Sequence, residues 1–259
     1  MSNPEPYVLR EDRDAIATLT LNRPATRNAL SQAMMTALEA QFDEVAADPA
    51  VKVLVIAGAG PGFCAGHDLR EVRTFDASAR TQLFAQCSRM MQRLTTLPVP
   101  VIARVHGIAT AAGCQLVASA DLAIAADTAR FAVSGINVGL FCSTPMVALS
   151  RAVPRKAAME MLLTGDVISA AEAAHRGLIN RAVPEAELDA AIQALAQKIA
   201  AKSRAAVALG KPAFYRQAEL PLADAYAHTA EVMVRNMEEA DAQEGIDAFM
   251  QKRKPVWAA

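Results

Sequence analysis

Two glycine-rich segments of this sequence could present backbone N–H groups to a ligand. Residues 58–69 end in Gly-His-Asp-Leu, and residues 107–115 place small residues directly before a predicted helix. Each segment follows a run typical of a buried strand, and the first N–H groups of a helix have no acceptor within it. Taken singly, the first segment also fits a plain strand-to-loop turn, and the second also fits close helix packing.

The two segments together indicate a more specific chemistry. Negative charge that develops on one oxygen of a thioester enolate or a tetrahedral intermediate is stabilised by two preorganised donors. Two N–H groups from separate strand-to-helix turns would supply such a pair. The sequence therefore predicts a site that polarises a carbonyl group.

The elements that would position these turns alternate between strand and helix. Residues 15–22 and 51–58 are short apolar runs, and a helix is predicted between them, which favours parallel strands joined by a right-handed crossover. A second set follows, with a helix over 79–97 and strands over 101–105 and 122–126. The first half is therefore predicted to be α/β.

The second half is predicted to be helical, because strand signals stop after Thr144. Four segments have the composition and spacing of helices: 155–164, 170–176, 185–203 and 221–252. We expect a core over 1–200 and a C-terminal helical region over 201–259. The apolar residues of that region exceed what a lone helical tail can bury, so it should dock on the core or on another subunit.

Composition excludes several classes of partner. The 259 residues carry 26 Lys+Arg and 27 Asp+Glu, a net charge of −1, so no global field attracts nucleic acid or an anionic membrane. The four cysteines show no metal-binding spacing, and we expect free thiols and no metal site. No run is long enough for a membrane span, and residues 1–20 lack the pattern of a targeting peptide, so we expect a cytoplasmic protein.

Five short motifs, in order along nearly the whole chain, resemble the enoyl-CoA hydratase/isomerase (crotonase) superfamily. They read Asn-Arg-Pro-x3-Asn-Ala-Leu, Phe-Cys-Ala-Gly-His-Asp-Leu, Ala-Gly-Cys-Gln-Leu, Leu-Thr-Gly-Asp and Ala-x3-Gly-Leu, over residues 22–30, 63–69, 112–116, 163–166 and 173–178. Any one of them is weak, and their order and spacing carry the resemblance. Residues 138–145 and 251–257 most resemble the subgroup called enoyl-CoA hydratase domain-containing protein 3.

The resemblance implies a crotonase (ClpP-like) fold of repeated ββα units, with a C-terminal helical region that assembles the chain into a homotrimer or a homohexamer. It implies an acyl-CoA or enoyl-CoA thioester as ligand, with coenzyme A as part of the substrate and no separate cofactor. The oxyanion hole would be formed by the N–H groups of His67 and Ala112. The residues implied along the coenzyme A moiety are Arg23, Arg27, Ala65, Asp68, Leu69, Phe249 and Lys252.

The sequence departs from the family at the two catalytic positions. Hydratases of the family carry glutamates where this chain has Gln115 and Gly135. Hydration needs one group to accept a proton from water and another to deliver one to carbon, and an amide or a glycine can do neither. Between Ala77 and Met159 the only acidic residues are Asp121 and Asp127, which we interpret as cap or turn residues rather than a displaced base.

Three other side chains near the motifs are interpreted as structural rather than catalytic. We expect His67 to contribute its backbone, His106 to be a satisfied structural histidine, and Cys142 to lack an adjacent base. Three functions stay open: a hydratase or isomerase of fatty-acid metabolism, a non-catalytic acyl-CoA-binding protein, and another crotonase reaction such as thioester hydrolysis or decarboxylation.

Overall fold

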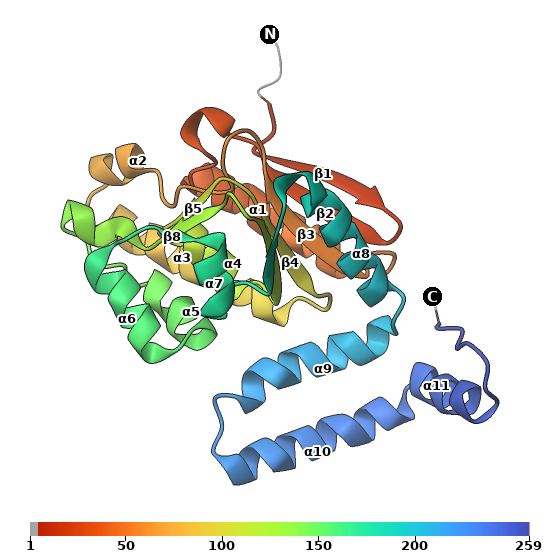
Figure 1. Cartoon of the computed structure of the whole chain (residues 1–259). Helices are drawn as coiled ribbons and strands as arrows, with labels where there is room; N and C mark the ends of the chain where they lie inside the picture. The colour runs from red at the N-terminus through yellow and green to blue at the C-terminus, as the bar shows by residue number, and fades with distance from the viewer. Residues whose placement is uncertain (1–4, 259) are drawn as a thin grey trace.

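The computed structural model describes residues 5–258, so the first four residues of the segment tested for a targeting peptide lie outside it. Its centre is a six-stranded sheet in the order β1-β2-β3-β4-β6-β9, parallel except for the β1–β2 hairpin (Figure 1). A second sheet has the order β5-β7-β8. The strands are β1 (Val8–Arg13), β2 (Ile16–Leu21), β3 (Val53–Gly58), β4 (Val101–Val105), β5 (Ile108–Thr110), β6 (Leu122–Ala126), β7 (Arg130–Ala132), β8 (Ile168–Ser169) and β9 (Arg181–Val183).

Helices cover both faces of the large sheet. Helix α1 packs against β1, β2 and α3, whereas α8 contacts β2, β3, β4 and β6. The helices are α1 (Gln32–Ala47), α2 (Leu69–Thr74), α3 (Ala77–Thr96), α4 (Ala112–Ser119), α5 (Pro145–Ala152), α6 (Arg155–Thr164), α7 (Ala170–His175), α8 (Leu188–Ala200), α9 (Arg204–Gln217), α10 (Leu222–Glu238) and α11 (Ala240–Met250). Short 3-10 turns are η1 (Pro24–Thr26), η2 (Ser134–Val138) and η3 (Glu185–Glu187).

The α/β prediction for the first half is confirmed, and β4 and β6 have the predicted bounds. The prediction that strands stop after Thr144 is wrong. Strand β9 pairs in parallel with β6, and β8 pairs with β7, so these short segments are strands because existing edges offer them backbone partners. Their few residues carry no recognisable periodicity of their own.

One further prediction on local structure is wrong, and one strand was not predicted. The single helix expected over 221–252 is broken at Glu239, whose φ of −68° and ψ of 140° are extended. The charged strand β1 was not predicted, because only Val8 of its six residues is buried and the strand carries no apolar alternation. It forms by pairing with β2 through a turn in which Asp14 and Ala15 both have positive φ, as type I′ hairpins require.

A buried ion pair docks α9 on the core. Lys211 Nζ lies 2.7 Å from Asp121 Oδ2 and donates to Val99 O at 2.8 Å. The same carboxylate accepts Val101 N–H at 2.6 Å and the Tyr215 hydroxyl at 2.8 Å. Burial is the largest influence on Lys211 and lowers its pKa, against the effect of Asp121. Asp121 is therefore a structural anchor for α9, a larger role than the predicted cap or turn residue, and its carboxylate is engaged by these partners.

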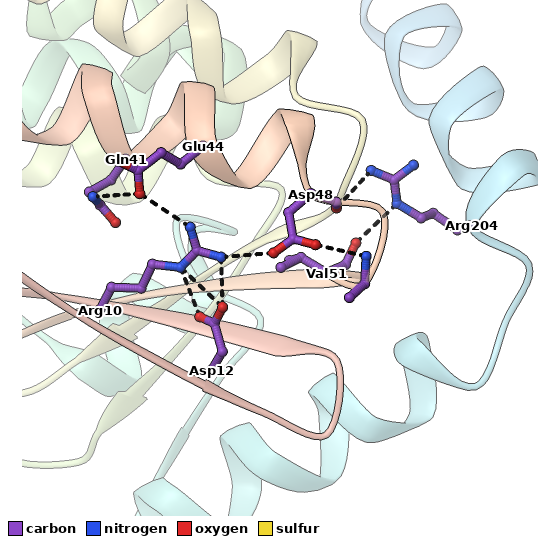
Figure 2. Close-up of polar contacts among 8 residues, drawn as sticks. Arg10, Asp12, Gln41, Glu44, Asp48, Val51 and Arg204 are labelled. Carbon is purple, nitrogen blue, oxygen red and sulfur yellow. Dashed lines mark hydrogen bonds and ion pairs between the residues drawn. The ribbon is translucent and has the colours of Figure 1, made fainter. Parts of the chain in front are cut away.

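A second polar cluster fixes the start of the same helix. Figure 2 shows Arg10 of β1 between the carboxylates of Asp12, Glu44 and Asp48, at 2.6, 3.4 and 3.2 Å. On the other side of Asp48, Arg204 Nε donates to Val51 O at 3.0 Å. The turn that follows α1 thus holds both the edge strand and the first residue of α9.

Beyond α9 the chain runs away from the sheet. Helices α9 and α10 lie side by side, and α11 packs against both (Figure 1). No helix within residues 5–258 is both long and apolar enough to cross a bilayer.

We predict that Asp121→Asn lowers the free energy of unfolding by about 3–5 kcal/mol, because Lys211 would stay buried without its counter-charge. Chemical denaturation monitored by circular dichroism measures this loss. The matched control is Asp43→Asn, since Asp43 pairs with Arg93 at the surface and such pairs contribute about 0–1 kcal/mol. Equal losses in the two variants would contradict the anchoring role.

Candidate active site

Backbone pairing brings the two glycine-rich segments together. Cys64 N–H donates to Ile108 O at 3.1 Å, and Thr110 N–H donates to Cys64 O at 3.0 Å. The Thr110 hydroxyl adds a bond to Ala65 O at 3.0 Å. Residues 63–65 therefore pair in parallel with β5. The turn that follows residues 63–65 and the turn that follows β5 consequently begin next to each other.

Gly66 lets the turns touch. Its φ is +88°, and a Cβ at this position would lie 2.9 Å from Ala111 Cβ and 3.0 Å from Thr110 O. A side chain would therefore push apart the segments that carry His67 and Ala112. Ala111 itself has a φ of 49° and a ψ of −117°, a conformation costly for a residue with a Cβ, and such strain is typical of functional turns.

The N–H groups of His67 and Ala112 are available to a ligand. Ala112 is the first residue of α4, and His67 directly follows Gly66. Within residues 5–258 neither group donates to a protein acceptor. The pair has the composition of an oxyanion hole: two main-chain donors from different turns, one of them at the positive end of a helix.

Asn28 supports this arrangement and was not among the predicted site residues. It is fully buried, and its amide donates to Ala59 O and Gly62 O, each at 2.9 Å, while Arg23 N–H donates to its Oδ1 at 2.8 Å. This one side chain ties the 22–28 loop to the segment before His67. The motif containing Asn28 was recognised, but its bonding depends on carbonyls more than thirty residues away, which spacing cannot reveal.

The His67 ring is anchored and neutral. Its Nδ1 lies 3.1 Å from Leu30 O, and since a carbonyl only accepts, Nδ1 carries the proton. Nε2 is buried and has no partner among residues 5–258, and the ring packs edge-on against Phe84 at 5.5 Å. Burial lowers the pKa of His67, partly opposed by Leu30 O. The bond from the ring to Leu30 O therefore helps to fix the main chain of His67, whose N–H is one of the two donors.

Gln115 lies one turn of α4 after Ala112. Its side chain is buried, and Oε1 has no hydrogen-bond partner in the part of the chain that the structure describes. Residues three apart on a helix share a face, so the amide lies on the face of α4 that carries the Ala112 donor. It can bind a donor or a water molecule, but it cannot exchange a proton.

Gly135 lies in η2 and has no space for a side chain. A Cβ there would lie 2.6 Å from Leu140 O and 2.8 Å from Cys142 Sγ. The turn is closed by Leu140 N–H, which donates to Gly135 O at 2.9 Å. A glutamate side chain, which the resemblance predicts at this position in hydratases, would therefore require residues 135–142 to rearrange.

Five of the residues predicted along coenzyme A belong to neighbouring loops. Ala65 N–H donates to Arg27 O at 3.0 Å, and Arg27 is exposed. The Asp68 carboxylate caps α2 by accepting Arg70 N–H at 2.9 Å, and the next residue, Leu69, is exposed. The Arg23 guanidinium stacks 3.6 Å above the Tyr7 ring.

Phe249 and Lys252 are not part of this group in the single chain. Phe249 is at the end of α11, in a helix that packs on α9 and α10, and Lys252 follows it in a left-handed conformation. Phe249 borders a cavity of about 330 Å³ together with Ala206, Ile246 and Trp257. A role for these two residues at the coenzyme A moiety stays a prediction and would require a neighbouring subunit.

The remaining candidates have structural roles. His106 Nε2 donates to Gly60 O at 2.8 Å and Nδ1 accepts from Arg104 at 3.2 Å, so the ring is satisfied beside a cavity of about 390 Å³ on the α8 side of the sheet. All four cysteines are free and buried. Burial raises the pKa of Cys64, Cys87 and Cys114 to about 12 and raises that of Cys142. The raised pKa values disfavour the thiolate form that a nucleophilic cysteine needs. Within the described residues no three ligating side chains gather around a possible metal position.

The fold and the paired turns define a family. A model of the family described as "Enoyl-CoA hydratase/isomerase" matches residues 11–259, and the chain belongs to this family. It is 50% identical over 258 residues to human "Enoyl-CoA hydratase domain-containing protein 3, mitochondrial", covering 99% of this chain and 85% of the relative. This agrees with the resemblance to that subgroup.

Solved structures support the same assignment. A Mycobacterium smegmatis structure described as enoyl-CoA hydratase superposes with a TM-score of 0.95 at 55% identity, covering 98% of this chain and 99% of the other. The human domain-containing protein 3 structure gives a TM-score of 0.94 at 49% identity, covering 97% and 100%. The predicted crotonase fold is confirmed.

The expectation of a cytoplasmic location is contradicted by the relatives. The human, mouse and Xenopus laevis proteins are all named as mitochondrial. Free buried thiols do not distinguish one reducing compartment from another, and the sequence pattern of residues 1–20 was too weak a basis for the inference.

We predict that Gly135→Glu lowers the free energy of unfolding by at least about 2 kcal/mol, because the turn that closes on Cys142 must open to admit the side chain. Gly210→Glu is the matched control, since Gly210 lies in α9 with open space around its Cβ position and glycine disfavours a helix interior. Chemical denaturation compares the two variants. A stable Gly135→Glu protein would contradict the steric argument.

We predict that stability falls as the pH drops below about 6.5, and that His67 contributes to this loss. Burial lowers the His67 pKa in the folded protein, so below the ordinary value of about 6.5 the unfolded chain binds more protons than the folded one. His67→Asn, which retains a short side-chain donor, should reduce the slope of unfolding free energy against pH between 7 and 5. His175→Asn, in α7, serves as the control. Equal slopes for wild type and His67→Asn would refute the assignment.

Proposed function

We propose that this protein binds an acyl-CoA thioester and polarises its carbonyl group without hydrating an enoyl substrate. The observation that carries the proposal is the contact of Gly66 with Ala111, which holds the free N–H groups of His67 and Ala112 at one place. Membership of the enoyl-CoA hydratase/isomerase family supports a CoA thioester as the ligand. Coenzyme A enters as part of the substrate.

The proposed mechanism uses main-chain donors alone for charge stabilisation. The thioester oxygen accepts from both N–H groups, and their effect grows as electron density moves onto that oxygen. The Ala112 donor also benefits from the α4 dipole. Neither Gln115 nor Gly135 can transfer a proton, so the pathway that adds water across a double bond is not available.

A second candidate is a non-catalytic acyl-CoA-binding protein. The closed turn at Gly135 favours it, because the position of one family carboxylate is filled by main chain and by Cys142. A third is thioester hydrolysis or decarboxylation, in which oxyanion stabilisation carries more of the barrier. Release of free acid from a panel of thioesters would indicate hydrolysis, and release of carbon dioxide would indicate decarboxylation. A non-catalytic binding protein would release neither.

We also propose assembly as a homotrimer or homohexamer. Large apolar side chains of α10 and α11 are exposed in the single chain, and the most exposed are Leu222, Tyr226, Phe249 and Met250. Subunit contacts would cover this surface. Phe249 and Lys252 of a neighbouring subunit would then complete a coenzyme A site begun by Arg23, Arg27, Ala65, Asp68 and Leu69.

We predict that Ala112→Pro abolishes the preference of the protein for a thioester over a thioether. Proline suits the first position of a helix but lacks the N–H, so the substitution removes one oxyanion donor. Wild type should bind butyryl-CoA about 10-fold or more tightly than S-butyl-CoA, which has no carbonyl oxygen. Isothermal titration calorimetry with both ligands and both proteins measures the change.

Controls separate binding from folding and from hydration. Circular dichroism and thermal melting must show that Ala112→Pro retains the fold, and S-butyl-CoA should bind both proteins alike. An unchanged thioester preference in the variant would reject the oxyanion assignment. Hydration of crotonyl-CoA by wild type well above a mock purification would reject the proposed loss of hydratase chemistry.

A further inference from the structure

The segment that follows Gly135 has an unusual surface. From Phe131 to Ser150 no residue is charged, yet much of the segment is exposed. Three large apolar side chains lie within four residues of its turn: Val138, Leu140 and Phe141, with exposed fractions of 62%, 53% and 40%. Single exposed apolar residues are ordinary, but a continuous uncharged and apolar surface indicates something that covers it.

The apolar turn adjoins the oxyanion hole. Ala111, the residue before the Ala112 donor, donates its N–H to Ala132 O at 2.9 Å. Gly135 follows Ala132 by three residues, a reach of at most about 10 Å. The turn then folds back on Gly135 through Leu140 and Cys142. The backbone thus keeps Gly135, on which the turn closes, within about 10 Å of Ala132, whose carbonyl accepts from the residue before the Ala112 donor.

The other turn of the site carries apolar surface as well. Leu69 and Phe84 are exposed to 54% and 38%, and Phe84 packs directly on the His67 ring. In Figure 1 α2, which begins at Leu69, lies on the same side of the molecule as α5 and α6, which follow the apolar turn in the sequence. Apolar groups therefore lie beside His67 as well as beside Gly135.

We propose that residues 138–141 form a binding surface for the acyl chain and make the protein selective for long, unsubstituted acyl groups. The inference rests on the proposed function, since it places the thioester carbonyl at His67 and Ala112. A chain of eight or more carbons would cover Leu140 and Phe141, whereas a four-carbon or a charged acyl group would leave them in water. The absence of charge over residues 131–150 fits a hydrocarbon occupant.

The test measures affinity against chain length. Isothermal titration calorimetry with butyryl-, octanoyl- and dodecanoyl-CoA should show Kd falling at least about 100-fold from four to twelve carbons, less than the roughly fourfold per methylene of full burial. The double variant Leu140→Ser/Phe141→Ser should weaken dodecanoyl-CoA about 10-fold or more and change butyryl-CoA by less than about 2-fold. Leu9→Ser, at an exposed apolar position of the edge strand β1, should change neither.

Each other outcome has a distinct meaning. Equal affinity of wild type for the three ligands, or an equal loss for butyryl- and dodecanoyl-CoA in the double variant, overturns the chain surface and leaves the proposed function standing. Failure of wild type to bind any acyl-CoA overturns the proposed function itself. A lower oligomeric mass of the double variant in size-exclusion chromatography with light scattering would show a subunit interface instead, and would also overturn the inference.

Discussion

The pairing of residues 63–65 with β5 is the constraint on which the site depends. Cys64 bonds to Ile108 and Thr110 and so draws the end of one strand-to-helix turn against the start of another. Gly66 allows the close approach to Ala111, and the buried Asn28 amide holds the segment before His67 by donating to Ala59 O. None of these groups would react with a substrate. They position two N–H groups that belong to no hydrogen bond within the described protein.

This arrangement separates two tasks that a hydratase performs together. Polarising a carbonyl needs only main-chain donors, which persist whatever the neighbouring side chains are. Transferring protons needs specific carboxylates, and here one position holds an amide and the other is closed by the turn through Leu140 and Cys142. Under the proposed function, the fold retains thioester recognition while its reaction changes. The exposed apolar surface beside Gly135 is consistent with a site reorganised around binding a hydrocarbon chain.

Local pattern predicted the strands and helices that bury a regular face. Strands β4 and β6 and helix α6 were predicted with their observed bounds, because each is a short apolar or amphipathic run between clear breaks. Strands β1 and β9 were missed, since their hydrogen-bond partners lie on other segments. Helix α9 contains Pro212 and few buried residues, and it owes its place to Lys211, Tyr215 and Arg204.

The sequence by itself determined the chemical inventory of the site. It supplied glycine and small residues at two turns, an amide and a glycine in place of two carboxylates, and only Asp121 and Asp127 as acids between Ala77 and Met159. Only the tertiary structure decided that Asp121 is committed to Lys211, that Asn28 supports the donor loop, and that Gly135 cannot accept a side chain. The physical reason is that composition fixes which groups exist, whereas availability depends on contacts between residues far apart in the chain.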